Sequence, residues 1–181
     1  MRIISGEHKG RRLAGGEKKK VRPTSDRVKE SIFNVLREEV MGKRILDLFA
    51  GAGSLGIEAL SRGAESATFV DASSQSINIL KKNLENLNLK SKSTILRLDG
   101  LKAINKLKQN FQMIFADPPY LKGYVQRVIG SVVQSEVLEK NGILILEHHK
   151  KETFSFPEEK LSILRQKKFG DTVISFFLKK R

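Results

Sequence analysis

Residues 44–56 read Arg-Ile-Leu-Asp-Leu-Phe-Ala-Gly-Ala-Gly-Ser-Leu-Gly. The apolar first half predicts a buried strand over 44–49, and the second half has the spacing G-x-G-x-x-G at the start of a helix predicted over 54–62. Glycines at 51 and 53 let the backbone turn sharply and approach a ligand closely, while the helix N-terminus offers free N–H groups. A strand, a glycine turn and a helix in this order indicate a site for a nucleotide-like cofactor.

Strands and helices continue to alternate along the rest of the chain. Short apolar runs predict further strands at 66–70, 93–98, 111–116 and 142–147. Helical patterns between them predict helices at 74–88, 101–108 and 123–138. Because helices join successive strands, the sequence predicts an α/β fold with a doubly wound, mostly parallel sheet. The last two runs, 161–167 and 172–178, flank a Gly-Asp turn and indicate an antiparallel hairpin.

Acidic residues follow several of these strands. Asp71, Asp99 and Asp117 each come directly after a predicted strand, and Asp47 lies near the end of the first one. The carboxyl ends of parallel strands meet at one edge of a sheet, so we expect these four carboxylates to converge there. Asp71, twenty residues beyond Gly51, is placed to hold a pair of ribose hydroxyls. Alternatively, Asp71 could cap the helix that follows it.

The residue before the glycine turn separates two classes of cofactor. A dinucleotide presents a pyrophosphate to such a turn, and the carboxylate of Asp47 would repel it. S-adenosylmethionine instead brings an ammonium group, which a carboxylate attracts. Alternatively, Asp47 could only accept hydrogen bonds from the loop backbone. The combination of this residue with the acidic strand ends favours S-adenosylmethionine over a nicotinamide dinucleotide.

A second motif, Asp117-Pro118-Pro119-Tyr120, closes the strand predicted over 111–116. Proline has no N–H and a fixed φ, so the turn is stiff and the Pro118 carbonyl is available to accept a hydrogen bond. Asp117 can accept a second one, and the ring of Tyr120 offers a face on which a base can stack. Such a turn suits an enzyme that holds a planar exocyclic amine. Alternatively, it is only a proline-rich turn that closes a strand.

Positive charge is concentrated in the segment that precedes this core. The chain has 34 Lys and Arg against 20 Asp and Glu, a net charge of +14, which indicates a polyanionic partner. The stretch from Lys9 to Lys29 contains nine basic residues and only two acidic ones, Glu17 and Asp26. We expect an RNA-binding arm here, with phosphate contacts from Lys9, Arg11, Arg12, Lys18, Lys19, Lys20 and Arg22. Alternatively, the run is a solvated surface loop.

An amphipathic helix is predicted between the basic run and the core. Thr24 or Ser25 can cap it after Pro23, and it would end near Gly42. Its apolar positions repeat on one face, at Val28, Ile32, Val35, Leu36 and Val40.

Other bulk properties limit the possible classes of protein. A chain of 181 residues is long enough for one domain with a full core. There is no cysteine and no apolar stretch of about 20 residues, so we expect a cytoplasmic protein without membrane association. Metal ligation is not expected, because only three histidines and no cysteines are present.

The two motifs together resemble those of the class I amino-methyltransferases. Residues 1–6, Met-Arg-Ile-Ile-Ser-Gly, and 22–30, Arg-Pro-Thr-Ser-Asp-Arg-Val-Lys-Glu, narrow the resemblance to the RsmD-like family of 16S ribosomal RNA guanine-N2 methyltransferases. The similarity runs nearly end to end. Ser5 stands where a glycine is common, and the stretch 15–20 is more basic than is typical.

The resemblance implies a Rossmann-like class I methyltransferase fold with a seven-stranded sheet. A single domain would join a basic N-terminal extension and helix (1–43) to a cofactor-binding and catalytic core (44–181). The implied catalytic residues are Asp117, Pro118, Pro119 and Tyr120. The implied S-adenosylmethionine contacts are Asp47, Phe49, Ala50, Gly51, Gly53, Asp71, Ala72, Asp99 and Gly100. The implied partner is ribosomal RNA, free or in the small subunit or its assembly intermediate, and the expected state is a monomer.

Three other functions stay open from the residues alone. The first is an amino-methyltransferase that uses the same type of tetrapeptide to hold adenine N6 in DNA or a glutamine in a protein. A non-catalytic RNA-binding assembly factor is a second possibility, against which the intact Asp117 and glycine turn argue. A dinucleotide-dependent dehydrogenase is a third and weaker one.

Overall fold

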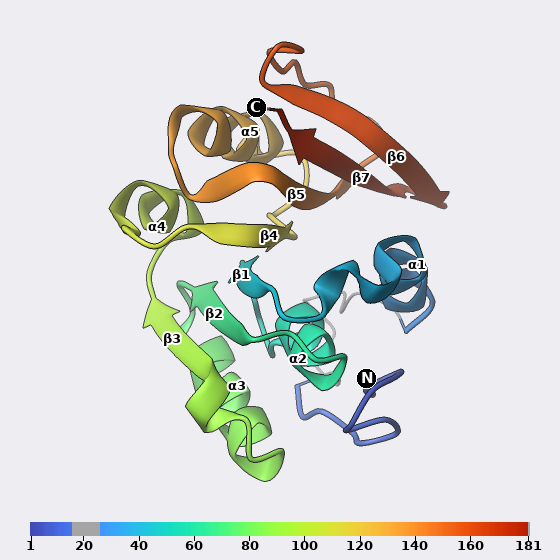
Figure 1. Cartoon of the computed structure of the whole chain (residues 1–181), viewed down its shortest axis with the longest axis vertical. Helices are drawn as coiled ribbons and strands as arrows, with labels where there is room; N and C mark the ends of the chain where they lie inside the picture. The colour runs from blue at the N-terminus through green and yellow to red at the C-terminus, as the bar shows by residue number, and fades with distance from the viewer. Residues whose placement is uncertain (16–25, 181) are drawn as a thin grey trace.

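The computed structural model describes residues 1–15 and 26–180. Within these residues, seven strands form one sheet in the order β3-β2-β1-β4-β5-β7-β6 (Figure 1). The strands are β1 (Arg44–Leu48), β2 (Ser66–Asp71), β3 (Ser93–Arg97), β4 (Phe111–Ala116), β5 (Leu138–His149), β6 (Leu161–Phe169) and β7 (Thr172–Lys179). Strands β1 to β5 pair in parallel, whereas β7 runs antiparallel to both β5 and β6. The predicted doubly wound sheet with an antiparallel C-terminal hairpin is confirmed.

Helices cover both faces of the sheet. They are α1 (Asp26–Leu36), α2 (Ser54–Ser61), α3 (Ser74–Asn86), α4 (Gly100–Lys106) and α5 (Tyr124–Gln134), with short 3-10 turns η1 (Arg37–Val40) and η2 (Lys90–Lys92). One apolar cluster holds the buried side chains of α1, α2 and α3, and a second holds those of α4 and α5. Burial of these two layers supplies the main favourable term in folding. None of the helices in the described residues is long and apolar enough to cross a membrane.

Residues 1–15 form a small antiparallel loop that is fastened to α2. The loop is closed by a bridge between Arg2 and Arg12. The buried carboxylate of Glu58, in α2, accepts hydrogen bonds from the backbone N–H of Ile4 at 2.8 Å and of Ser5 at 3.0 Å. Because Glu58 is fully buried, these bonds replace its lost hydration. The N-terminal segment is therefore an integral wall of the first apolar cluster.

The same segment is also fastened to α3, through Asn83. Its side chain is 2% exposed and its oxygen accepts from the Ala14 N–H at 2.8 Å. Its amide nitrogen donates to the carbonyl of Ala14 at 3.2 Å and to that of Ala52, in the glycine turn, at 2.9 Å. A β-carbon on Gly15 would lie only 3.0 Å from the Ala52 β-carbon. The end of the N-terminal loop therefore lies directly against the glycine turn.

Two predicted helix ends were wrong. The first α-helix ends at Leu36 and not near Gly42, because Arg37 has a φ of +48°, which an α-helix cannot contain. The last predicted helix ends at Gln134, and β5 begins at Leu138, which pairs with Phe111 before an irregularity in the register of β4 and β5. The predicted cap of the first helix, at Thr24 or Ser25 after Pro23, lies outside the described residues.

Candidate active site

Four neighbouring strands bring the predicted carboxylates to one edge of the sheet. Strands β3, β2, β1 and β4 are adjacent and parallel, so their carboxyl ends lie side by side (Figure 1). Asp47 lies in β1 and Asp71 ends β2, whereas Asp99 and Asp117 follow β3 and β4. The expected convergence at this edge is confirmed.

The glycine turn between β1 and α2 combines open space with close packing. Gly51 and Gly53 have φ values of +55° and +85°, a region that other residues rarely adopt. A β-carbon on Gly51 would meet nothing within 4 Å, whereas one on Gly53 would lie 2.4 Å from the Leu80 side chain. Ala50, predicted as a cofactor contact, donates its N–H to the Val70 carbonyl at 2.9 Å. The turn is thus closely packed at Gly53, whereas the space beside Gly51 is open.

Asp47 is buried and fastens the start of α2. Its side chain accepts the N–H of Gly56 at 2.8 Å, and Gly56 lies in the first turn of that helix. Burial raises the pKa of Asp47 to about 7, and the negative charge of Asp71 adds to this shift. Asp47 therefore does accept a backbone hydrogen bond, as in the alternative interpretation, but from the helix residue Gly56 and not from the loop. Its attraction for a cofactor ammonium stays a prediction.

Asp71 connects the end of β2 to the glycine turn. One carboxylate oxygen accepts the N–H of Gly51 and the other accepts the N–H of Ser73, each at 2.8 Å. The N-cap of α3 is Ser73, whose hydroxyl accepts the Ser76 N–H at 3.2 Å. Asp71 is only half-buried, and each oxygen can accept a further hydrogen bond. It can therefore still receive ribose hydroxyls beside the exposed Ala72.

A wall of aromatic side chains lies beside Asp99 and Gly100. Asp99 caps α4 by accepting the N–H groups of its first turn, both at 3.1 Å. A β-carbon on Gly100 would lie 2.7 Å from the ring of Phe49, which explains why a glycine stands there. The Phe49 ring meets Tyr124, at the start of α5, edge to face with 5.7 Å between centroids. Tyr124 was not predicted, and its only sequence signal is an aromatic residue after Gly123.

The turn after β4 is anchored by the hydroxyl of Tyr120. This hydroxyl donates to Glu147, in β5, and lies 3.1 Å from the Thr172 hydroxyl, in β7. Burial and the charge of Glu147 raise the pKa of Tyr120, so its hydroxyl stays neutral. Pro118 is buried, whereas Pro119 is exposed. Tyr120 is thus held at the edge of the sheet by two residues that were not predicted as part of the site.

A second carboxylate outside the predicted set fastens the same turn. Glu152 accepts the N–H of Leu121 at 3.0 Å with one oxygen and the N–H of His149 at 2.9 Å with the other. Two further bonds join α5 to the same segment, because Gln126 and Ser155 exchange hydrogen bonds of 3.0 and 2.8 Å. The turn after β4 and the segment after β5 are therefore locked together.

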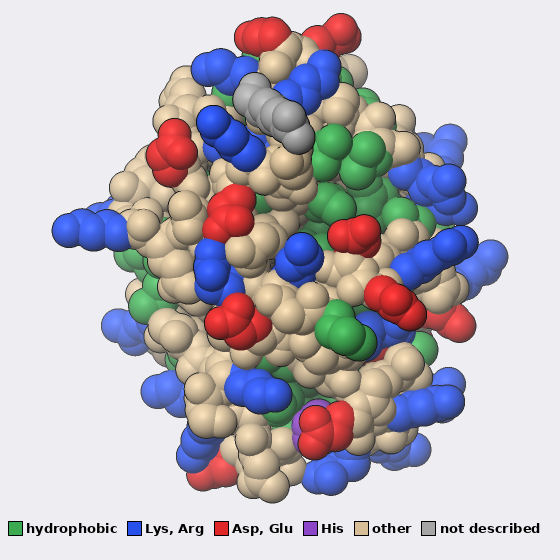
Figure 2. Space-filling view, in the orientation of Figure 1, with side chains coloured by type: hydrophobic (Ala, Val, Ile, Leu, Met, Phe, Trp, Pro, Cys, Tyr) green, Lys and Arg blue, Asp and Glu red, His purple; other side chains and the backbone are tan. Residues whose placement is uncertain are grey.

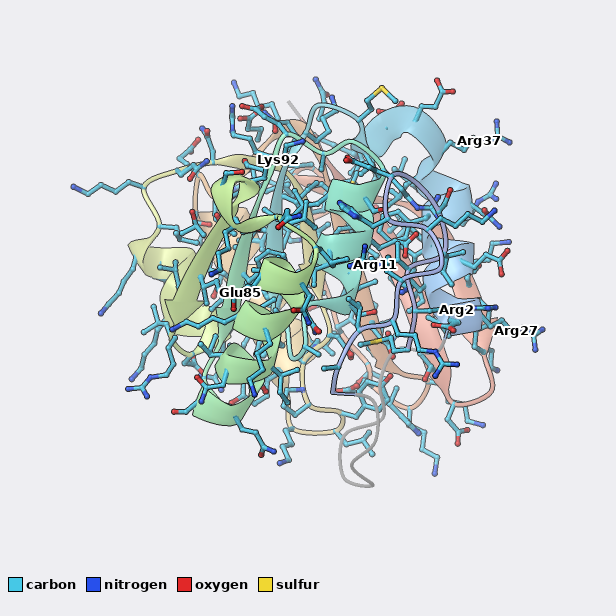
Figure 3. All side chains as sticks on the ribbon, turned by 90° about the horizontal axis from the view of Figure 1, so that it is seen from below. Arg2, Arg11, Arg27, Arg37, Glu85 and Lys92 are labelled. Carbon is cyan, nitrogen blue, oxygen red and sulfur yellow. The ribbon has the colours of Figure 1, made fainter. Side chains whose placement is uncertain are left out.

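The basic residues divide into three groups. Lys9, Arg11, Arg12 and Arg27 are exposed. Arg11 and Arg27 are labelled in Figure 3, and the Arg11 guanidinium donates to the Asn86 carbonyl at 2.8 Å. Lys29 was expected within the phosphate-contacting run, and this was wrong, because its side chain is fully buried against Glu58. The third group lies outside the described residues and comprises Lys18, Lys19, Lys20 and Arg22.

Basic side chains are not confined to the N-terminal segment. In Figure 2, Lys and Arg are spread over the whole visible face, with Asp and Glu between them. Among the described residues, no group of three or more His, Cys, Asp or Glu is placed to hold a metal ion. His148 is buried, and its ring lies 2.8 Å from the Ser175 hydroxyl.

Comparison with known proteins relates this arrangement to a family. The family model described as conserved hypothetical protein 95 matches residues 1–178. Ribosomal RNA small subunit methyltransferase D of Haemophilus influenzae is 34% identical, over 98% of this chain and 92% of its own. The corresponding Escherichia coli protein is 37% identical, over 80% of this chain and 69% of its own.

Solved structures agree with the sequence relatives. The structure of the Escherichia coli protein yhhF superposes with a TM-score of 0.90 and 28% identity, over 99% of this chain and 98% of that one. The match therefore extends over nearly the whole length of both chains. The chain belongs to the conserved hypothetical protein 95 family, together with the ribosomal RNA small subunit methyltransferases D.

Proposed function

We propose that the protein transfers a methyl group from S-adenosylmethionine to the exocyclic N2 amine of a guanine in 16S ribosomal RNA. The observation that carries the proposal is the pairing of β1 with β4, in which Leu48 lies beside Ala116. Each of these residues ends its strand, so the glycine turn and the turn that begins at Asp117 leave the sheet next to each other. A cofactor at one turn and an amine at the other would then be neighbours. The relatives named as ribosomal RNA methyltransferases support the substrate class.

The residues at the edge of the sheet fit S-adenosylmethionine. The open space at Gly51 admits the methionine end, and Asp71 can accept ribose hydroxyls while it holds the turn. Phe49, packed on Gly100, offers an aromatic wall for the adenine. Bound there, the cofactor supplies an electrophilic methyl group on a sulfonium centre. A structure with 17% identity and a TM-score of 0.70, described as a complex with SAH, shares this fold.

The turn after β4 would hold the acceptor. Asp117 and the Pro118 carbonyl accept hydrogen bonds from the two protons of the guanine amine, which directs the nitrogen lone pair away from them. No strong general base is needed, because the amine loses its proton after the methyl group is transferred. Holding the two reactants in this geometry can contribute about 7–11 kcal/mol to the acceleration. The ring of Tyr120 is fixed by its hydroxyl and offers a surface for the base.

We further propose that the enzyme acts as a monomer in the cytoplasm, on the small ribosomal subunit or on an intermediate of its assembly. The exposed Lys9, Arg11 and Arg12 would contact phosphates, together with Lys18, Lys19, Lys20 and Arg22.

The test is mass spectrometry of ribosomal RNA from cells that lack the gene, carried out on nucleosides to measure N2-methylguanosine and on nuclease fragments to locate it. We expect N2-methylguanosine to be lost from one position of the small-subunit RNA and restored by the wild-type gene. A gene with Asp117→Ala should not restore it. An unchanged nucleoside profile, with methyl incorporation into DNA or protein by the purified enzyme, would favour adenine N6 or glutamine as the acceptor.

A further inference from the structure

Leu121, the residue after the predicted catalytic tetrapeptide, is an exposed apolar side chain. It is 60% exposed and one of four large hydrophobic residues that are exposed in the described parts of the chain. Two of the others, Met41 and Leu164, line a groove between η1 and β6, with a volume of about 1050 Å³. Leu121 instead stands at the edge of the sheet that carries Asp117. A single exposed leucine needs no explanation, so its backbone must be considered as well.

The backbone of Leu121 is held in an unfavourable conformation. Its φ is +57°, in the left-handed region that bulky residues rarely adopt. The Glu152 carboxylate fixes it there, because one oxygen binds the Leu121 N–H and the other binds the end of β5 through His149. Glycine would adopt this conformation without strain, yet the chain has a leucine here. A strained residue that the surroundings hold in place is a candidate for a functional role.

The surroundings of Leu121 fit a nucleic acid. Lys122 follows it and Lys151 precedes Glu152, and both lysines are exposed. An exposed apolar side chain in a loop region that also carries exposed lysines complements a partner with flat apolar bases and a phosphate backbone. Enzymes that modify a base must first remove it from its stack, and proteins that distort nucleic acids commonly insert an apolar side chain between bases.

We propose that Leu121 is a wedge that enters the RNA stack beside the target guanine, and that Glu152 is the positioning residue that presents it. This inference rests on the proposed function, since it requires an RNA guanine as the acceptor. The side chain would take the place of the extruded base, while Asp117 and the Pro118 carbonyl hold the guanine amine. Leu121 then contributes to reaching the reactive geometry and not to binding of the cofactor.

The direct test uses 2-aminopurine, whose fluorescence rises when the base leaves its stack. In a ribosomal RNA fragment, 2-aminopurine replaces the target guanine, whose position mass spectrometry of nuclease fragments gives. The fluorescence is measured with this RNA bound to the protein in the presence of S-adenosylhomocysteine. Wild-type protein should raise the fluorescence, and Leu121→Ala should reduce this rise. With the unmodified fragment, single-turnover methylation by Leu121→Ala should fall at least about fivefold, because an inserted apolar side chain offsets an unstacking cost of about a few kcal/mol. Leu121→Met should restore most of both signals.

Three comparisons separate a wedge from a structural role. Leu164→Ala, at the second exposed leucine, should leave fluorescence and rate unchanged. Leu121→Gly should lower the rate without lowering the melting temperature, because it relieves the strained backbone. On an RNA in which the guanine is already unstacked, Leu121→Ala should approach the wild-type rate.

Glu152→Ala should lower the methylation rate, with an unchanged dissociation constant for the cofactor, and Glu152→Gln should recover part of it. Equal fluorescence and rates for wild type and Leu121→Ala would overturn the wedge. So would an equal loss on stacked and unstacked guanine. A wild-type enzyme that methylates no ribosomal RNA would instead refute the proposed function.

Discussion

The Nζ of Lys29 lies 3.3 Å from a carboxylate oxygen of Glu58, and both side chains are fully buried. Lys29 also donates to the Arg2 carbonyl, and Glu58 also accepts from Arg62 at 2.8 Å. Burial lowers the pKa of Lys29, and the charge of Glu58 opposes that shift. The pair joins α1, α2 and the N-terminal loop in the middle of the first apolar cluster.

Removing one partner of this pair should destabilise the fold. Lys29→Met removes one of the two cations that the buried Glu58 carboxylate contacts, and Arg62 remains. We therefore expect a cost of about 3 kcal/mol of unfolding free energy, the lower end for breaking a buried pair. Urea denaturation measures the difference. The matched control is the exposed pair of Lys90 and Glu85, whose loss in Lys90→Met should leave the midpoint nearly unchanged. Similar midpoints for both variants would show that the buried pair is not important for stability.

Stability should depend on pH through Asp47. Its pKa in the folded protein is about 7, above that of an unfolded aspartate, so the folded state retains a proton that the unfolded state loses. The resulting stabilisation is fully present below about pH 4 and is lost as the pH rises to about 7. Asp47→Asn has no titrating group and keeps an acceptor for Gly56. The difference in melting temperature between wild type and this variant should therefore shift in favour of Asp47→Asn between pH 4 and 7, and a constant difference would contradict the raised pKa.

Replacement of Asp71 should weaken cofactor binding. Asp71→Ala removes the acceptor of the Gly51 N–H and of the proposed ribose hydroxyls, and a bond to a charged group is worth about 1.5–3 kcal/mol. Calorimetry should show a rise of at least about tenfold in the dissociation constant of S-adenosylmethionine. Retention of RNA on a filter serves as the control and should not change. Wild-type cofactor affinity would restrict Asp71 to holding the loop.

Replacement of Asp117 should affect chemistry and not cofactor binding. Asp117→Ala loses an acceptor for the amine, so single-turnover methylation should fall by orders of magnitude, with a cofactor dissociation constant within a few-fold of wild type. Asp117→Asn keeps one oxygen and should lose less. The opposite pattern, with lost cofactor affinity and intact methylation, would show that the role of Asp117 is misassigned.

The basic run should carry affinity for RNA. Each phosphate neutralised adds about 0.7–0.9 to the slope of log K against log salt concentration. Changing Lys18, Lys19 and Lys20 to Ala should therefore flatten the slope and raise KM for ribosomal RNA, measured at several salt concentrations. Glu85→Ala on α3 is a control with an exposed charge elsewhere. Equal slopes for the triple variant and the wild type would mean that these lysines do not contact phosphates.

The sequence predicted the sheet well because its signals are local. An apolar strand, a glycine turn and an acidic strand end each lie within a few residues, so the edge that carries Asp71 and Asp117 followed from pattern alone. Bonds between distant segments left no such signal. Glu147 and Tyr120 are hydrogen-bonded although they lie 27 residues apart in the sequence, and Glu152 and Leu121 lie 31 residues apart. Lys29 was misread for the same reason, since its burial depends on Glu58 in another helix.

The attachment of residues 1–15 determines how this chain can be shortened. A fragment that starts at residue 44 would retain the whole sheet, but Glu58 would lose its N-terminal backbone partners, Asn83 would lose its bonds to Ala14, and Lys29 would be absent. The apolar surface that Ile3 and Leu13 cover would also be exposed to water. Such a fragment should aggregate, so engineered fusions or chimaeras should exchange residues 1–43 only together with α2 and α3.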